Sequence, residues 1–124
     1  MEIMVVVIIT GTLAALALTT YTKTVNRARV ENAIRQLTLI HGANQVYRAR
    51  NGKLWPNISG SYPLIDINAN LHLNLSNDDF NFSCFNGNGT VWTCTATKGS
   101  LDPTVTVTEA PISATNPRCT TYCP

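Results

Sequence analysis

The sequence predicts an α+β protein in which a long N-terminal helix packs, through its C-terminal half, against a small antiparallel sheet. Three observations predict this fold. An uncharged apolar run covers residues 3–22, apolar residues then recur at helical spacing to about residue 49, and alternating segments with four cysteines fill the C-terminal half. With 124 residues, the chain is long enough for one domain.

Residues 1–22 are expected to form a hydrophobic transmembrane or filament-core helix. No charged residue occurs from Ile3 to Thr22, and a helix of that length spans roughly 30 Å, the thickness of a bilayer core. A cleaved secretory signal would need a basic segment ahead of the apolar run. Here Glu2 is the only charge ahead of it. We therefore interpret the segment as part of the working protein.

Residues 23–50 are expected to continue the same helix as an amphipathic half that belongs to the head. Apolar residues recur there in steps of three and four, which is typical of a helix with one inward face. The expected inward positions are Val25, Ala28, Val30, Ala33, Ile34, Leu37, Ile40, Ala43, Val46 and Tyr47. Asn51 and Gly52 give a stop signal, so the helix should end near Ala49.

Charge is segregated along the chain. From Lys23 to Lys53 there are seven Lys and Arg and one acid, whereas the part from Leu54 onward holds two bases and five acids. One interpretation is a solvated helix face beside a mildly acidic domain. The other is complementarity between stacked copies, with the basic helix of one copy facing the acidic head of another.

Residues 51–79 are expected to form a long connecting loop, and residues 80–124 a β-rich head that contains disulfides. Within the loop, Leu71, Leu73 and Leu75 alternate as in a short strand. In the head we expect strands at 80–85 and 90–97 around a turn at Asn86–Gly89, a third strand at Thr104–Thr108, and an irregular tail. One face of the hairpin would carry Phe80, Phe82, Cys84, Trp92, Cys94 and Ala96.

The four cysteines indicate two disulfides and an oxidising compartment, because an even count in a small loop-rich domain is typical of disulfide scaffolds. Three pairings exist. We favour Cys84–Cys94 and Cys119–Cys123, since each pair lies in one local segment and the hairpin brings the first pair together. A zinc site is the rival interpretation, but His41 and His72 are far from the cysteines in sequence.

No motif for catalysis is present, and we expect neither an enzyme nor a cofactor nor a metal site. The sequence has no Gly-rich phosphate loop, no HExxH and no GxSxG. The acids considered as calcium ligands are Asp66, Asp78, Asp79 and Asp102, and their spacing fits no known pattern. The Lys and Arg residues clustered on the helix could bind the phosphates of a nucleic acid, but aromatic residues are not interleaved with them, so nucleic acid is a possible partner that is not indicated.

Glycosylation sequons begin at Asn57, Asn74, Asn81 and Asn88.

Glu2 is the residue that most needs an explanation, because a carboxylate buried alone at the edge of an apolar run costs several kcal/mol. It either lies in the headgroup layer, favoured by the helix dipole, or pairs with a cation of a neighbouring chain, such as an N-terminal amine. In the second case Glu2 sets the register of assembly, because any other register leaves a buried unpaired charge.

The segment from Glu2 to Arg29 resembles the N-terminus of type IV pilins and the related secretion pseudopilins, with Gly11, Leu13-Ala-Ala15 and Tyr21 in matching places. The resemblance implies a short basic leader that a prepilin peptidase removes before methylating the new N-terminus. It also implies an inner-membrane pool and packing into a helical filament. The family's glutamate maps onto Glu2, where it would neutralise the N-terminal amine of an adjacent subunit.

The sequence departs from the family in two ways. Only one residue precedes Glu2, whereas members of the family have a few more residues before their glutamate after the leader is cleaved. We therefore expect that the first residues and the leader are missing from this numbering. Thr19 stands where the family often has a proline. The stem of family filaments loses helix near that stretch, and we expect loosening between about Gly11 and Thr20, because glycine and threonine are poor helix formers.

These observations favour a pilin, a non-enzymatic subunit that polymerises with itself into a filament on the cell surface, after an inner-membrane precursor stage that involves the pilus assembly machinery. The alternatives are a major pseudopilin of a type II secretion system and a monomeric membrane-anchored binding module. Lys23, Arg27 and Arg29 after the span would by themselves place the C-terminal half in the cytoplasm. The cysteines favour the outside, and a basic leader would reconcile the two.

Overall fold

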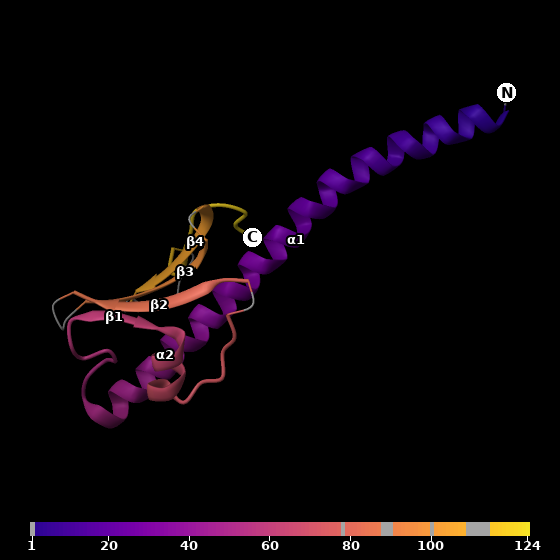
Figure 1. The fold of residues 1–124 in the computed structure, drawn as a ribbon. Coiled ribbons are helices and arrows are strands. Elements are labelled where there is room, and N and C mark those ends of the chain that lie inside the picture. Colours follow the sequence, from indigo (N-terminus) through magenta and orange to yellow (C-terminus); the bar gives the residue numbers. More distant parts are fainter. Residues whose placement is uncertain (1, 78, 88–90, 100, 109–114) are drawn as a thin grey trace.

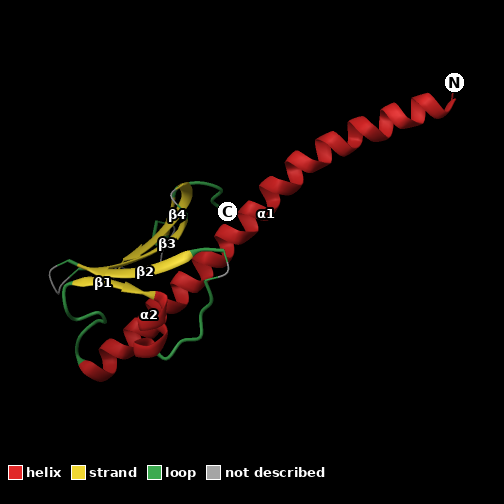
Figure 2. Ribbon diagram, viewed as in Figure 1, coloured by secondary structure: helices red, strands yellow, loops and turns green. Residues whose placement is uncertain are grey.

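The computed structural model describes residues 2–77, 79–87, 91–99, 101–108 and 115–124 (Figure 1). One long helix crosses a face of a five-stranded antiparallel sheet, and its N-terminal half extends well beyond the sheet (Figure 2). This is the α+β architecture that the sequence predicts. The elements in chain order are α1 (Glu2–Asn51), β1 (Gly60–Pro63), α2 (Leu64–Leu71), β2 (Asn81–Asn86), β3 (Trp92–Lys98), β4 (Leu101–Thr108) and β5 (Arg118–Cys119).

Helix α1 is continuous over 50 residues, a length of about 75 Å at the standard helical rise. It ends where Gly52 adopts a φ of 73° and donates its N–H to the carbonyl of Arg48 at 2.8 Å. Glycine reaches this left-handed conformation without steric cost, so it is a favourable residue just after a helix. The end lies two residues beyond the expected Ala49.

The covered face of α1 is narrower than the predicted stripe. Its buried residues are Val30, Ala33, Leu37, Ile40, His41 and Asn44. The prediction was wrong for Ala28 and Val46, which are exposed. Val46 follows the helical spacing but points away from the sheet, and the polar residues His41 and Asn44 lie on the covered face instead. His41 packs against Trp92, with ring centroids 5.9 Å apart.

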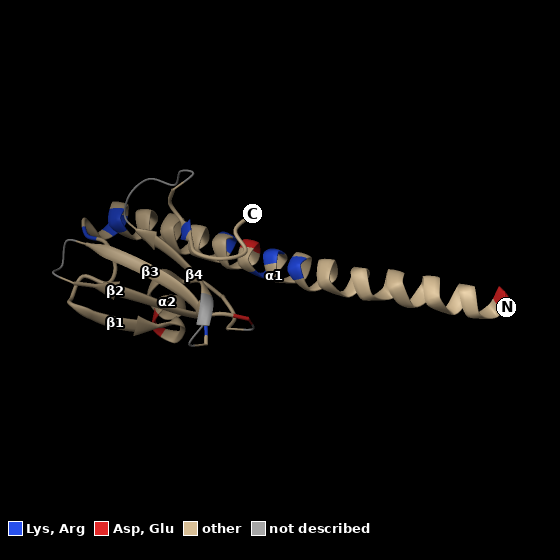
Figure 3. Ribbon diagram, turned by 90° about the horizontal axis from the view of Figure 1, so that it is seen from above, with Lys and Arg blue, Asp and Glu red and all other residues tan. Residues whose placement is uncertain are grey.

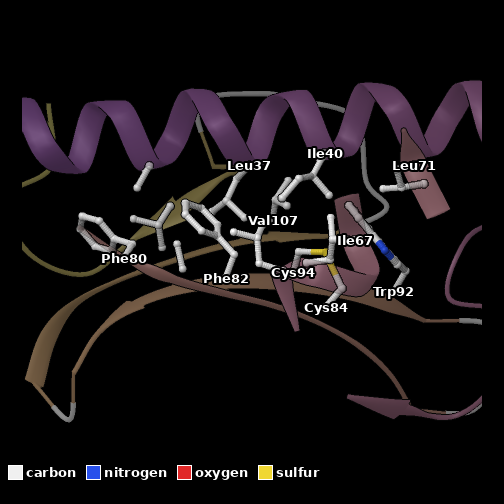
Figure 4. Packing of buried hydrophobic residues seen from close by; sticks show 14 of the residues in the cluster. Leu37, Ile40, Ile67, Leu71, Phe80, Phe82, Cys84, Trp92, Cys94 and Val107 are labelled. Atoms are coloured by element: carbon white, nitrogen blue, oxygen red, sulfur yellow. A yellow bond between two sulfur atoms is a disulfide. The ribbon is translucent and has the colours of Figure 1, made fainter. Parts of the chain in front are cut away.

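The sheet has the order β1-β2-β3-β4-β5, with every neighbouring pair antiparallel. Its inner face is apolar because Phe82, Cys84, Cys94, Ala96 and Val107 alternate with outward Ser and Thr residues and are all buried. Figure 4 shows the side chains of Phe82, Cys84, Cys94 and Val107 beneath Leu37 and Ile40 of α1, in the same buried cluster. The predicted inner face of the hairpin is therefore confirmed, although residues 88 and 89 of its turn and the sequon residue Asn88 lie outside the described part.

The segment expected as a connecting loop contains two regular elements, β1 and α2. Strand β1 pairs with β2, and α2 covers the inner face through Leu64, Ile67 and Leu71. The short strand expected at residues 71–75 was wrong, because Leu71 ends α2. The side-chain amide of Asn68 then binds both the N–H and the carbonyl of Leu75, at 3.1 and 2.9 Å, which takes the place of strand pairing.

The tail is mostly the irregular, disulfide-bonded segment that was expected, but it also contains one short strand. Arg118–Cys119 form a two-residue strand, β5, against β4. The hydroxyl of Thr120 accepts the N–H of Thr104 at 3.0 Å, and the carbonyl of Thr104 accepts the N–H of Thr120 at 3.1 Å. The tail is thus attached to the edge of the sheet by backbone and side-chain hydrogen bonds.

Asn44 connects the end of α1 to the chain that leaves it. Its side-chain oxygen accepts the N–H of Trp55 at 2.8 Å, and its side-chain nitrogen donates to the carbonyl of the same residue at 2.5 Å. Asn44 is 1% exposed and Trp55 is 5% exposed. The side-chain nitrogen of Asn86 donates to the carbonyl of Pro56, the residue that follows Trp55. The turn from α1 towards β1 is therefore fixed by two buried asparagines.

Replacing Asn44 by Ala should lower the free energy of unfolding by about 2–4 kcal/mol, because the N–H and carbonyl of Trp55 lose their partners in a buried place. Gln45→Ala is the matched control, since Gln45 is the exposed amide-bearing neighbour on the same helix, and its effect should stay within about 0.5 kcal/mol. Urea unfolding of the full chain in mild detergent, followed by the fluorescence of the two buried tryptophans, Trp55 and Trp92, measures both. Equal effects of the two substitutions would contradict the stabilising role of the Asn44–Trp55 hydrogen bonds.

Candidate assembly surface

The first part of α1 is uncovered on all sides. Every residue from 2 to 24, here called the stem, is exposed, and the stem projects from the head as a single rod (Figure 1). Its large apolar side chains are Ile3, Met4, Val5, Val6, Val7, Ile8, Ile9, Leu13, Leu16 and Leu18. Soluble monomers rarely expose a contiguous apolar surface of this size. The stem therefore needs to be covered by something outside the chain.

The threonines of the stem do not make its surface polar. Each donates its hydroxyl to a helix carbonyl three or four residues earlier, at distances between 2.7 and 3.3 Å. The threonines concerned are Thr10, Thr12, Thr19, Thr20, Thr22 and Thr24. Because the donors are satisfied inside the helix, the side chains present mainly methyl groups outward. This surface suits hydrocarbon or another helix equally well.

Helix α1 is long and apolar enough in its first part to cross a membrane, as judged by its length and composition. Both a membrane anchor and a signal sequence would meet that description. The stem runs without a break through Gly11 and Thr19. The expected loosening near these residues concerns stems packed in a filament, so it stays a prediction.

Glu2 lies at the tip of the stem, far from the other acids (Figure 3). It is the only charged residue among residues 1–22, and it belongs to the first turn of α1. No described residue forms an ion pair with it. Assembly through Glu2 therefore requires a partner from a second chain, and this role remains a prediction.

The basic residues of α1 gather where the stem meets the head and again near the end of the helix (Figure 3). Two of them are paired: Arg29 Nε lies 3.4 Å from Asp79 Oδ1, and Arg35 Nη2 lies 2.7 Å from Glu31 Oε1. Lys23, Arg27, Arg48 and Arg50 of α1, and Lys53 just beyond it, have no acidic partner among the residues that the structure describes. The sequence alone does not distinguish the basic residues that form ion pairs from those that do not.

The four cysteines form two disulfides, Cys84–Cys94 and Cys119–Cys123. These are the two pairings that the sequence favoured. Cys84 and Cys94 face each other across β2 and β3 and are fully buried. Cys119 is half-buried and Cys123 is exposed, so the second disulfide closes a small surface loop in the tail.

The described residues contain no group of three or more His, Cys, Asp and Glu side chains that could hold a metal ion. Of the acids considered as calcium ligands, Asp66 lies in the first turn of α2, and Asp79 pairs with Arg29. Asp78 and the side chain of Asp102 lie outside the described part. The described sequon asparagines, Asn57, Asn74 and Asn81, are all exposed.

No family model, curated protein or solved structure matches this chain.

Proposed function

We propose that this chain is the structural subunit of a type IV pilus-like helical filament. Copies pack through their stems, and the heads form the outer surface. The observation that carries the proposal is the bare stem: residues 2–24 present apolar side chains on all sides, while the same helix continues into the core of a folded head. The resemblance of Glu2–Arg29 to type IV pilins agrees with this geometry.

The energetics favour stem packing over exposure. Each large apolar side chain gains about 1.5–3 kcal/mol when it is taken out of water, and the stem carries ten between Ile3 and Leu18. A lipid bilayer covers this surface in the precursor, and neighbouring stems cover it in the filament. Because the threonine hydroxyls are bonded within the helix, neither environment leaves them unsatisfied.

Glu2 supplies the register in this proposal. Among residues 1–22 it is the only charge, so a bundle of stems has a single depth at which each Glu2 meets an N-terminal amine of a neighbour. The precursor resides in the inner membrane, and the filament lies outside the cell. An oxidising compartment there agrees with the two disulfides.

A second candidate is a monomeric binding module held in the membrane by the stem. It is favoured by the length of the apolar run alone, which suffices to cross a bilayer. A pseudopilin of a secretion system is a variant of the first candidate, with a shorter periplasmic filament.

Electron microscopy of material sheared from the source cells, with mass spectrometry of any filaments, separates these candidates. We expect thin filaments built from this chain, with both disulfides intact and a methylated N-terminal amine. If the chain is found only as a monomer in the membrane fraction, the stem is merely an anchor and the filament proposal fails.

A charge placed in the stem should block assembly. Leu16→Arg puts a cation on a side chain that is 70% exposed in the single chain, so the fold of the head should be unaffected. In a stem bundle the same cation is buried without a partner, and we expect filament yield to fall about a hundredfold. The matched control is Ile65→Arg, because Ile65 is 75% exposed on α2 of the head. Quantitative immunoblots of the sheared fraction measure the yield, and wild-type yield for Leu16→Arg would contradict stem packing.

A further inference from the structure

Three exposed residues of a distinct kind lie at the end of the stem and just beyond it. Tyr21 is 68% exposed, and Lys23 and Arg27 are also exposed. Tyr21 is the first aromatic residue of the chain, and Lys23 is the first base. Lys23 and Arg27 have no ion pair within the described residues, in contrast to Arg29, which binds Asp79 at 3.4 Å.

The spacing of these residues matches the layers of a bilayer. From Glu2 to Tyr21 the helix rises by roughly 28 Å, close to the ~30 Å thickness of the hydrocarbon core. From Tyr21 to Arg27 it rises by a further 9 Å or so, close to the roughly 5–8 Å of one headgroup layer. Tyrosine concentrates at this depth in membrane proteins, because its ring is apolar and its hydroxyl is polar. Lysine and arginine extend their charged ends to the same level.

We propose that Tyr21, Lys23 and Arg27 form a binding belt for the phosphate groups of anionic phospholipids around the membrane-inserted precursor. The inference depends on the membrane stage of the proposed function and not on the filament. Lys23 and Arg27 are one helical turn apart and can bind neighbouring lipid phosphates. Arg29 is excluded from the belt because Asp79 already neutralises it, and Arg35 is excluded because it pairs with Glu31.

The belt also sets how the head meets the membrane. The Arg29–Asp79 ion pair lies just two residues beyond Arg27, so in this proposal Asp79, two residues before β2, lies close to the lipid surface. Pulling the stem out of the bilayer would then break the contacts of two cations with lipid phosphate. The anionic lipid content of the membrane would thereby influence how readily a precursor leaves it.

Native mass spectrometry of the purified full chain in detergent tests the belt. The probe is an equimolar mixture of phosphatidylglycerol and phosphatidylcholine, and the readout is the ratio of the two lipids that remain bound. Each cation near an anionic surface contributes about a fivefold preference, so Lys23→Gln with Arg27→Gln should lower the ratio at least fivefold. Lys23→Arg with Arg27→Lys should retain the wild-type ratio.

The matched control is Arg48→Gln with Arg50→Gln, which removes the same charge about 35–40 Å farther along α1. These two arginines also have no acidic partner among the described residues, so the control removes charge without breaking an ion pair. We expect the control to keep the lipid preference. An equal loss in the control would mean a diffuse effect of net charge and would overturn the belt, as would a wild-type chain that binds the two lipids equally. A failure to find filaments on cells would leave a positive lipid result standing, so the two proposals fail separately.

Discussion

Replacing Glu2 by Gln is expected to reduce filament yield by about a hundredfold or more while leaving the fold of the head unchanged. Glu2 lies at the tip of the stem, and no described residue contacts its carboxylate in an ion pair, so the head does not depend on it. In a bundle of stems, the carboxylate and the amine that it meets are removed from water together. Removing one partner of such a pair leaves the other charge buried and costs about 3–5 kcal/mol per contact.

The matched control is Glu31→Gln on the same helix. Glu31 pairs with Arg35 at 2.7 Å, but the pair is largely exposed, with 74% of the Arg35 side chain accessible. An exposed helical pair of this kind contributes only about 0.3–0.5 kcal/mol, so filament yield should stay near that of the wild type. Yield is measured on sheared material by immunoblotting and microscopy, and circular dichroism of the purified variants checks the fold. Normal filaments from the Glu2→Gln variant would show that the carboxylate has no role in register.

The parts of the fold that the sequence could predict are those with long, uniform patterns. The stem follows from an uninterrupted apolar run, and the hairpin of β2 and β3 follows from alternation on both sides of a glycine-rich turn. Strand β1 has the sequence GSYP, which carries no alternation of apolar residues, and its place is fixed by pairing with β2. Helix α2 had a signal at Leu64, Ile67 and Leu71, but eight residues are too few to separate helical spacing from a packed loop.

Buried polar residues were missed for a different reason. Asn44 is polar and lies outside the apolar stripe, so hydropathy gives no sign that it is buried. Its burial depends on Trp55, eleven residues later, which offers both backbone groups to one amide. Sequence patterns describe a residue by its neighbours along the helix, whereas the partner of Asn44 comes from a segment that folds back over it.

The candidate surface could be predicted in outline but not in its chemistry. The uncharged apolar run in the sequence shows where the stem lies and that Glu2 stands at its end. That the stem threonines turn their hydroxyls inward depends on side-chain rotamers. That Arg29 is neutralised, while Arg27 has no acidic partner in the described part of the chain, depends on Asp79, fifty residues away in sequence. The inward threonine hydroxyls make the stem surface apolar, and the pairing of Arg29 leaves Lys23 and Arg27 as the cations of the proposed belt. Neither property can be read from the sequence.

The second large effect concerns the disulfides. Replacing Cys84 and Cys94 together by Ala should lower the free energy of unfolding by about 3–5 kcal/mol. Closing a ring of about ten residues restricts the unfolded chain by about 3 kcal/mol. Because both cysteines are fully buried between the sheet and α1, the loss of their sulfur atoms adds a cost for the cavity that remains.

The tail disulfide provides the comparison. Replacing Cys119 and Cys123 by Ala opens a ring of about five residues, for which the same entropy argument gives about 2 kcal/mol at most. Cys123 is exposed, so little packing is lost. Urea unfolding of both variants in mild detergent, followed by the fluorescence of Trp55 and Trp92, should therefore rank the buried pair well above the tail pair. The opposite ranking would mean that the tail, through β5 and Thr120, holds the edge of β4 in place and that the hairpin of β2 and β3 is stable without its covalent link.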